Sequence, residues 1–288
     1  MQEDLGYSDE TRIREVRGAR DTQALEAWLK NAGPAAGEAV NLSIVVPAYN
    51  EERRLPPTLI DMIDFFDARP ATYEIIVVDD GSKDDTSGVV QKFEKIRTQV
   101  RGIRLPKNYG KGHAVRTGAL NAKGELILFA DADGSTPIEE VDRLVEAINS
   151  GAEVAIGSRA LQSEETKVKT RFYRKVIGRV FNFLVNMFLL PGVADTQCGF
   201  KIFTKNAARF LFSNQQSDGF SFDLELLLLA RKAQLSFSEV PVNWENVPGS
   251  KVNLVFDSAK MFCDIFRFAW IHRSISADDY QKSLPKEP

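Results

Sequence analysis

The sequence predicts an α/β protein whose central sheet is mostly parallel and carries helices on both faces. Two observations lead to this prediction. Short, almost wholly apolar runs alternate with longer amphipathic runs between residues 42 and 158, which is the pattern of β-α units with buried parallel strands. In addition, charged residues directly follow several of the apolar runs. The carboxyl ends of parallel strands meet along one rim of a sheet, where open sheets bind ligands.

The elements of the first half can be placed from their apolar spacing. A glycine-rich loop at residues 107–112 separates the third strand from the third helix. After the fourth strand, Thr136, Pro137 and Glu139 predict a helix start, with Thr136 as the cap and Pro137 in the first helical position. The predicted strands are residues 42–47, 73–80, 102–105, 127–130 and 154–158, and the predicted helices are residues 55–67, 86–98 and a third that ends near residue 122.

The second half carries two long apolar segments with polar or basic residues beside them. Residues 176–193 follow a basic stretch at 167–175, and residues 256–271 mix Phe, Met and Trp with charged side chains. This pattern is typical of a helix that lies in a membrane interface, and equally of a core helix with a basic end. A buried helix from Phe222 and a last strand at residues 237–242 are also predicted.

Composition limits the classes of protein that this chain can be. Of the 288 residues, 43% are hydrophobic and 27% charged, and the net charge is −3, which is ordinary for a globular protein and gives no general affinity for nucleic acid. Cys198 and Cys263 show neither metal-type spacing nor a disulfide pattern, which favours a reducing, cytoplasmic compartment. No apolar run reaches the roughly 20 residues that a membrane-spanning helix needs, so any membrane contact is expected at the surface.

Three parts of the chain differ in composition. Residues 1–40 are polar and end in a Gly/Ala/Pro run, which predicts a flexible N-terminal arm. Residues 41–255 are expected to form the catalytic domain, including an amphipathic helix at 170–192 that we expect to bind membranes. Residues 256–288 are expected to form a C-terminal amphipathic helix followed by a tail.

The clearest chemistry follows the strand at residues 127–130, where Asp131, Ala132 and Asp133 begin the next loop. Alternate side chains of an extended backbone share a face, so both carboxylates can point at one cation. Such a pair suits Mg²⁺ or Mn²⁺, with phosphate oxygens and water completing an octahedron. Acidic pairs are also common in turns, so the neighbouring motifs have to show whether this pair binds a metal. The sequence contains neither a Gly-x-Gly-x-x-Gly nor a P-loop fingerprint.

Six short motifs lie in order at residues 46–51, 78–82, 108–112, 131–133, 157–159 and 195–201. Together they resemble the family 2 glycosyltransferases of GT-A (Rossmann-like) fold, over about residues 42–270. Each motif alone is loose, but six in order are specific for the family. Residues 131–134, 195–203, 242–244 and 249–251 resemble more narrowly the dolichyl-phosphate β-glucosyltransferases and related polyprenyl-phosphate sugar synthases.

The resemblance implies a metal-dependent, inverting hexosyltransferase that uses Mg²⁺ or Mn²⁺. It places Asp133 on the cation that bridges the donor's diphosphate and Asp131 on the same metal or on the ribose. Asp80 is implied to accept a hydrogen bond from the base, and Lys111, between two glycines, to approach the nucleotide. The residues implied to bind the nucleotide sugar are Pro47, Tyr49, Glu51, Asp80, Lys111, Asp131, Ala132, Gln197 and Lys251.

On the acceptor side, the resemblance implies that Arg159 and Arg174 hold a phosphate, since a guanidinium can bond two phosphate oxygens. The implied catalytic residues are Asp133, Arg159 and Asp195. A phosphate monoester is already anionic near neutral pH, with a second pKa of about 6, so it needs little help from a general base. An alcohol acceptor would need one, and Asp195 is then the candidate.

The expected reaction is transfer of glucose from UDP-glucose to dolichyl (polyprenyl) phosphate, giving dolichyl β-D-glucosyl phosphate, by a peripherally membrane-associated enzyme. The alternatives are mannose transfer from GDP-mannose, a family 2 transferase acting on an alcohol, a nucleotidyltransferase and a non-catalytic nucleotide-sugar sensor. Residues 47–52 lack the glycine- and arginine-rich stretch of a nucleotidyltransferase. Asp223 and Glu225 are expected either at the sugar or as helix caps, and His113 and His272 are expected to be structural.

Overall fold

The computed structural model describes residues 40–69, 71–161, 166–169, 185–186, 190–247 and 254–285. Its strands form a seven-stranded sheet and, apart from it, a two-stranded ladder. The sheet strands are β1 (Leu42–Ala48), β2 (Tyr73–Asp79), β3 (Val100–Arg104), β4 (Leu126–Ala130), β5 (Val154–Ser158), β7 (Phe200–Thr204) and β8 (Phe237–Pro241), and the ladder pairs β6 (Val168–Lys169) with β9 (Trp244–Glu245).

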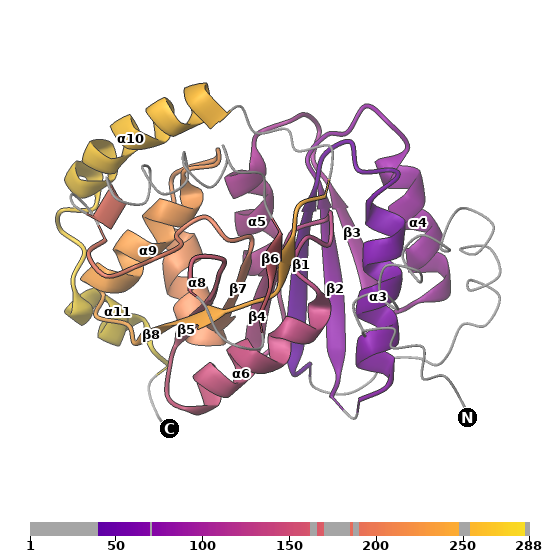
Figure 1. The fold of residues 1–288 in the computed structure, drawn as a ribbon, viewed down its shortest axis with the longest axis horizontal. Coiled ribbons are helices and arrows are strands. Elements are labelled where there is room, and N and C mark those ends of the chain that lie inside the picture. Colours follow the sequence, from indigo (N-terminus) through magenta and orange to yellow (C-terminus); the bar gives the residue numbers. More distant parts are fainter. Residues whose placement is uncertain are drawn as a thin grey trace, which may run out of the picture.

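The strand order in the sheet is β3-β2-β1-β4-β7-β5-β8, as Figure 1 shows. All neighbours are parallel except at β7, which runs antiparallel to both β4 and β5. The prediction of a mostly parallel α/β sheet is therefore confirmed. Strand β7 and the helix after it were not predicted, because residues 200 and 201 were assigned to the sixth motif and Lys201 interrupts the short apolar run.

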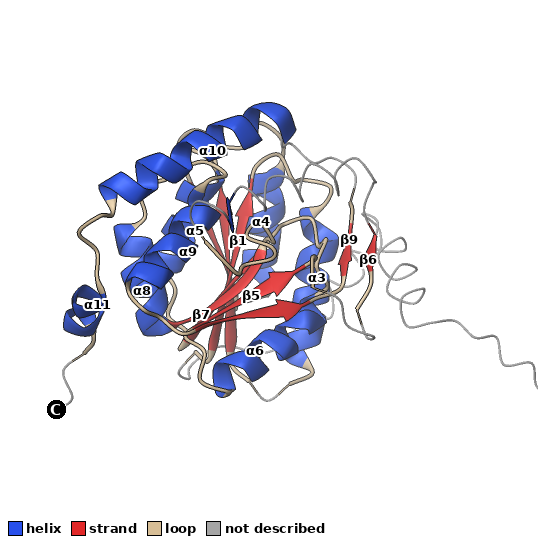
Figure 2. Ribbon diagram, turned by 60° about the vertical axis from the view of Figure 1, so that its left-hand side comes forward, coloured by secondary structure: helices blue, strands red, loops and turns tan. Residues whose placement is uncertain are grey.

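Helices cover both faces of the sheet, as the turned view in Figure 2 shows. Buried side chains of α3, α4 and α6 pack on one face, and those of α5, α8 and α9 pack on the other. Helix α10 lies over α9, and α11 packs on α8. The helices are α3 (Leu55–Asp67), α4 (Thr86–Ile96), α5 (Lys111–Leu120), α6 (Val141–Asn149), α8 (Lys205–Asn214), α9 (Phe222–Lys232), α10 (Leu254–Ile271) and α11 (Ala277–Ser283).

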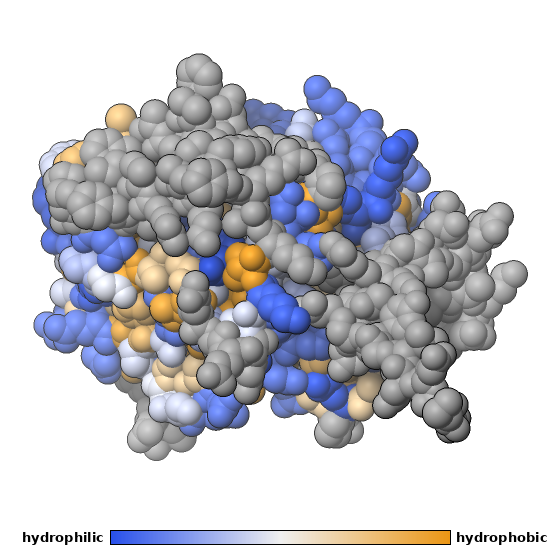
Figure 3. Space-filling view, viewed as in Figure 1, coloured by the Kyte–Doolittle hydropathy of each residue, from blue (hydrophilic) through white to orange (hydrophobic). Residues whose placement is uncertain are grey.

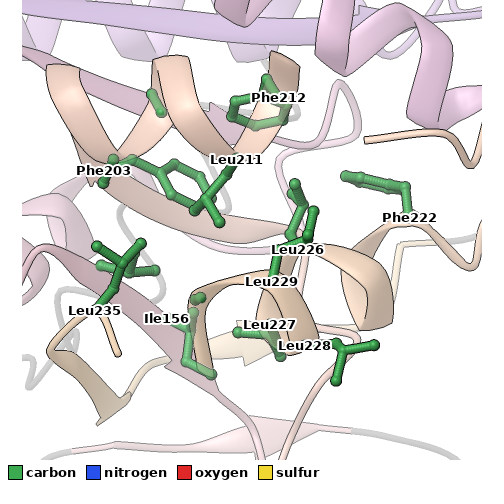
Figure 4. Close-up of a cluster of buried hydrophobic side chains, with 14 of the residues drawn as sticks. Ile156, Phe203, Leu211, Phe212, Phe222, Leu226, Leu227, Leu228, Leu229 and Leu235 are labelled. Atoms are coloured by element: carbon green, nitrogen blue, oxygen red, sulfur yellow. The ribbon is translucent and has the colours of Figure 1, made fainter. Parts of the chain in front are cut away.

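The sheet separates two large apolar clusters. Ile44 points into one and Val45 into the other, because successive side chains of a strand point to opposite faces. Figure 4 shows part of the second cluster, where Phe203 of β7 and Leu211 of α8 meet the leucines of α9. Leu226 to Leu229 are all at most 5% exposed, so α9 is apolar nearly all round and is buried as such a helix must be.

Two local predictions were wrong. The helix after the acidic pair begins later than expected: a 3-10 turn at Ile138–Glu140 precedes α6, Pro137 is the residue before that turn, and no side chain caps it. The C-terminal residues 277–283 form α11 rather than a tail. Ser276 caps α11 through a capping box with Asp279, a signal that is legible in the sequence once a helix is considered.

Several expected features lie wholly or mostly outside the described residues. These include the N-terminal arm, Arg174, Lys251 and most of the predicted amphipathic helix at 170–192. Within that last segment Val185 and Leu190 are fully buried, so at these positions the apolar side chains belong to the core. No helix in the described part of the chain is both long and apolar enough to span a membrane.

The sheet brings the predicted site residues to one rim. The parallel strands β1, β2, β4 and β5 all end there, and each is followed by polar residues. Because β7 is reversed, its first residue, Phe200, pairs with Ala130 at the end of β4. The segment at 195–199 therefore lies beside Asp131, which puts the sixth motif next to the fourth.

Candidate active site

Asp80, at the end of β2, organises the glycine-rich loop. Its Oδ1 accepts a hydrogen bond from the Tyr109 backbone N–H and its Oδ2 one from the Gly110 N–H, each at 2.8 Å. Burial raises the pKa of Asp80, although these two N–H groups oppose the rise. Asp80 was expected to accept a hydrogen bond from the nucleotide base. Two carboxylate oxygens have about four acceptor sites, so the loop contacts leave room for that role.

Lys111, the first residue of α5, reaches the acidic pair. Its Nζ lies 2.7 Å from Asp131 Oδ1 and 5.1 Å from the centre of the Phe129 ring. Burial alone would lower the pKa of Lys111, but Asp131 and Asp223 outweigh it and the pKa is raised. For Asp131 burial dominates and raises the pKa, in spite of Lys111. The lysine therefore stays charged at the rim, where it can face a diphosphate.

Gly199 approaches the Asp131 carboxylate so closely that no side chain fits. A Cβ built on Gly199 would lie 2.0 Å from Asp131 Oδ2. The Asp131 N–H also donates to the Gly199 carbonyl at 3.1 Å. The fourth and sixth motifs are thus fitted to each other, which explains why a glycine follows Cys198.

The second carboxylate, Asp133, lies in the turn after β4. Its Oδ1 accepts from the Ser135 N–H at 3.0 Å, and its Oδ2 lies 3.8 Å from Arg54 Nη1. The same arginine donates through Nε to Glu51 at 2.7 Å. The expected nucleotide residue Glu51 therefore contacts Asp133 through Arg54, a residue that was not predicted.

The remaining donor-side residues are placed as follows. Pro47 and Tyr49 lie at the end of β1 and are half-buried. Ala132 is buried, and its carbonyl accepts a hydrogen bond from Thr58 Oγ1 of α3 at 3.0 Å. Helix α3 thereby fixes the turn between the two carboxylates, and Thr58 is a supporting residue that no motif marked.

Arg159 and Asp195 form a bidentate ion pair on the opposite side of the rim. Arg159 donates through Nε at 2.7 Å, Nη2 at 2.9 Å and its backbone N–H at 3.0 Å. Burial alone would raise the pKa of Asp195, but Arg159 outweighs it and the pKa is lowered. Two of the five guanidinium N–H donors point at Asp195, so the others can still face an anion.

A side chain of β8 binds the backbone of the segment that contains Asp195. Glu239 accepts the backbone N–H groups of Ala194 at 2.8 Å and Asp195 at 2.7 Å. In the described part of the chain, Thr196 Oγ1 and Gln197 Nε2 are buried without a hydrogen-bond partner. Unpartnered buried polar atoms are rare, and Gln197 was expected to contact the transferred sugar.

Two further acidic residues of this region have buried partners. Asp223 accepts from Lys201 Nζ at 2.6 Å, and the same Nζ donates to the Cys198 carbonyl at 2.6 Å. Glu225 accepts from the Gln216 and Ser217 N–H groups at 3.0 Å and 2.7 Å. Ser221 is the residue before α9, and it makes no side-chain cap. Both carboxylates thus have partners inside the protein: Asp223 pairs with Lys201, and Glu225 binds the backbone of residues 216 and 217.

The acidic pair suits a divalent cation that the substrate helps to hold. No cluster of three or more acidic, histidine or cysteine side chains in the described ranges could bind a metal alone. Mg²⁺ usually takes one or two carboxylates and fills its remaining positions with phosphate oxygens and water. Asp131 and Asp133 supply hard oxygen ligands beside Lys111, which fits that donor set.

The sequence profile of glycosyl transferase family 2 matches residues 43–212. The chain belongs to this family, and the resemblance drawn from its motifs is confirmed. Similar proteins are dolichyl-phosphate β-glucosyltransferases: the human protein is 42% identical over 224 residues, covering 73% of this chain and 69% of its own. The Drosophila melanogaster protein is 40% identical over 252 residues, covering 83% and 77%. The Saccharomyces cerevisiae protein is 37% identical over 254 residues, covering 81% and 76%.

Solved structures give the same fold. Glucosyl-3-phosphoglycerate synthase from Mycobacterium tuberculosis, in complex with Mg²⁺ and UDP, superposes with a TM-score of 0.57 at 19% identity, covering 88% of this chain and 83% of that one. A further mycobacterial crystal structure reaches 0.58 at 18% identity, covering 89% and 80%. At such identities the likeness establishes the fold alone, and it confirms the predicted GT-A class.

Proposed function

We propose that this glycosyltransferase moves glucose from UDP-glucose to dolichyl or another polyprenyl phosphate with inversion at the anomeric carbon. The observation that carries the proposal is the similarity of 37–42% identity to dolichyl-phosphate β-glucosyltransferases from three organisms. In the reaction, an oxygen of the acceptor phosphate bonds to the anomeric carbon, and the bond to the diphosphate breaks with UDP as leaving group. One displacement turns an α-linked donor into a β-linked product.

The donor side of the rim suits the diphosphate. Asp131 and Asp133 would hold Mg²⁺ or Mn²⁺, which supplies Lewis-acid stabilisation of the departing diphosphate when bound. Lys111 adds a fixed positive charge beside the same phosphates, and it is already oriented by Asp131 at 2.7 Å. Asp80 holds the loop that carries Lys111 and offers its remaining acceptor sites to the base.

The acceptor side favours an anionic nucleophile over an alcohol. A general base needs a pKa near the operating pH, whereas Arg159 holds the pKa of Asp195 below its ordinary value. Asp223 is occupied by Lys201. A phosphate monoester needs no such base. We therefore assign Arg159 to the acceptor phosphate and Asp195 to holding Arg159 in place; Arg174 and Lys251 stay predictions.

Helix α10 carries the exposed surface that we propose for contact with the lipid. Phe266 and Trp270 are 53% and 67% exposed, and the Arg273 guanidinium lies 4.8 Å from the Trp270 ring. Arg267 on the same helix is also exposed. Aromatic side chains beside cations suit an anionic membrane interface. Figure 3 shows hydrophilic residues at the upper right of the molecule, on the side away from this helix.

A donor and acceptor panel tests the reaction. The full chain is incubated with UDP- or GDP-sugars, a short polyprenyl phosphate or its alcohol, and Mn²⁺ or chelator, and the lipid product is analysed by NMR. We expect a β-glucosyl phosphate from UDP-glucose, lost with chelator. Transfer to the alcohol but not to the phosphate would overturn the acceptor assignment, and transfer from GDP-mannose alone would overturn the donor.

Vesicle binding tests the surface. Phe266→Ser with Trp270→Ser should lower partitioning onto vesicles of anionic phospholipid about tenfold, since two apolar side chains leave the interface. Leu120→Ser is the matched control, because Leu120 is 48% exposed on α5 and is not part of this surface. Equal partitioning of both variants and the wild type would contradict the role of α10.

A further inference from the structure

Helix α10 contacts the interior of the protein through polar groups as well as apolar ones. On its inner side, Asp264 accepts a hydrogen bond from Ser221 Oγ just before α9. Directly after the helix, His272 Nε2 lies 2.6 Å from Glu225 Oε1 in the first turns of α9. Asp264, His272, Ser221 and Glu225 are all buried. Figure 1 shows α10 lying across α9 along this contact.

Glu225 is the junction of these contacts. It is fully buried and accepts the Gln216 N–H through Oε1 and the Ser217 N–H through Oε2, in addition to His272. Because both backbone N–H groups donate to Glu225, we assign His272 Nε2 as the third donor to this carboxylate. Loss of one donor from a buried carboxylate leaves part of its desolvation uncompensated.

The segment that Glu225 holds lies against the glycine-rich loop. Asp218 O accepts the His113 N–H at 3.1 Å, and Gln215 Nε2 donates to the Gly112 carbonyl at 2.9 Å. Gly110 has a φ of +116°, and a Cβ there would lie 2.3 Å from Asp218 O. The two backbones are therefore in direct contact on both sides of Lys111.

We propose that His272 is a positioning residue for the donor site: through Glu225 it fixes residues 215–219, and these fix the loop that presents Lys111 to the diphosphate. The chain of contacts runs from α10 to Asp131 without a gap, since Lys111 Nζ is 2.7 Å from that carboxylate. The identity of the ligand, a nucleoside diphosphate, rests on the proposed function. His272 itself touches neither substrate.

The expected defect is in donor binding. Without the His272 donor, the 215–219 segment and the loop lose a fixed arrangement, so Lys111 samples positions away from the diphosphate. We expect His272→Ala to weaken UDP affinity and raise the KM for UDP-glucose about tenfold, which is the effect of one such hydrogen bond. The KM for the acceptor and the kcat at saturating donor should change less than twofold.

The test compares four variants of the full chain. His272→Gln keeps an N–H donor at similar reach and should restore UDP affinity to within about twofold of wild type. Glu225→Gln replaces one acceptor oxygen with a donor and should weaken UDP binding as His272→Ala does. Tyr280→Phe is the matched control: Tyr280 lies on α11, and the substitution removes its 2.6 Å hydrogen bond to Glu153, a residue outside both the loop and residues 215–219.

Two readouts separate this proposal from the proposed function. Calorimetry measures UDP affinity, and hydrogen exchange measures protection of the amides at 110–113 and 216–217. Faster exchange at both segments in His272→Ala, with rescue in His272→Gln, supports the positioning role. Wild-type exchange and UDP affinity in His272→Ala would overturn it. Failure of the wild type to bind UDP would overturn the proposed function instead, and exchange at 110–113 would still decide the role of His272.

Discussion

The charges of the acidic side chains in and around the site are compensated differently in the two halves of the chain, the first ending after Asp133 and the second beginning at Arg159. In the first half, the three carboxylates of Asp131, Asp133 and Glu51 share two cations, because Lys111 pairs with Asp131 while Arg54 lies near both Asp133 and Glu51, and the Asp131 side chain is 33% exposed. In the second half, Asp223 has Lys201, and their side chains are 4% and 0% exposed. Asp195 has Arg159, and Glu225 has hydrogen bonds to His272 and to two backbone N–H groups. The first half therefore leaves negative charge for a cation to neutralise, whereas the carboxylates of the second half already have partners inside the protein.

This difference separates binding from support. A carboxylate that stays partly exposed to solvent, and whose negative charge is not fully compensated by the protein, can change partners when a metal and a diphosphate bind. A carboxylate that is fully paired inside the protein cannot exchange its partner without leaving a buried charge behind. We therefore expect substitutions of the acidic pair in the first half to act on transfer, and removal of one partner from a fully buried pair such as Lys201–Asp223 in the second half to act mostly on stability.

The largest effect is expected at Asp133. Asp133→Asn keeps the shape and removes a metal-binding charge, so transfer should fall on the order of 10³-fold, about 4 kcal/mol of barrier. The melting temperature should stay close to that of the wild type, because Asp133 is at the surface of the turn. Asp142→Asn is the control, since Asp142 lies on α6, is 61% exposed and pairs with Arg69. Full activity of Asp133→Asn would remove the contrast between the two halves.

The next largest effect is on stability, at Lys201. Lys201→Met leaves Asp223 buried and unpaired, which should lower the free energy of unfolding by about 3 kcal/mol. Lys205→Met is the matched control: Lys205 lies 2.6 Å from Glu125, the same distance as in the buried pair, but the two side chains are 27% and 69% exposed. That variant should lose less than about 1 kcal/mol. Equal losses in urea unfolding would show that burial does not distinguish these pairs.

The fold could be predicted from sequence where strands are continuous and apolar. Residues 42–47, 73–80 and 154–158 were predicted as strands within one residue of the observed bounds, because a strand that is buried on both faces has an unmistakable composition. Strand β7 is also rich in apolar residues, but it does not belong to the regular alternation of strands and helices in the first half of the chain. Its direction depends on pairing with β4 and β5, which only the tertiary structure decides.

The motifs mark residues that the structure brings together at the rim, but they do not mark side chains that act through another side chain. The acidic pair, Lys111 and Arg159 stand in motifs and meet at the rim. Arg54 stands in no motif, and Lys201 ends the sixth motif but was given no role there; their partners lie 79 and 22 positions further along the chain. His272 was expected to be structural because no second histidine or cysteine accompanies it; its partner Glu225 is 47 positions away.

A smaller effect, confined to one substrate, is expected at Arg159. Arg159→Lys keeps a positive charge for Asp195 but loses the planar fork that bonds two phosphate oxygens. We expect the KM for polyprenyl phosphate to rise about tenfold, and the KM for UDP-glucose to stay within about twofold of wild type. A rise in the donor KM alone would place Arg159 on the donor side and blur the division of the rim.

The smallest effect is one of sign, in the dependence of stability on pH. Burial raises the pKa of Asp80, so the native state holds that proton more tightly than the unfolded chain; the contribution to stability is full below about pH 4 and is lost as pH rises through the folded pKa. Arg159 lowers the pKa of Asp195, so the unfolded chain binds more protons; this contribution is full above about pH 4 and is lost as pH falls through the folded pKa. Urea unfolding between pH 3 and 6, with chelator present, should show that Asp80→Asn makes the slope of stability against pH more positive than in the wild type. Asp195→Asn should make it less positive. If both variants shift the slope in the same direction, the carboxylates of the two halves are not held by opposing forces, and the contrast between them fails at its simplest measurement.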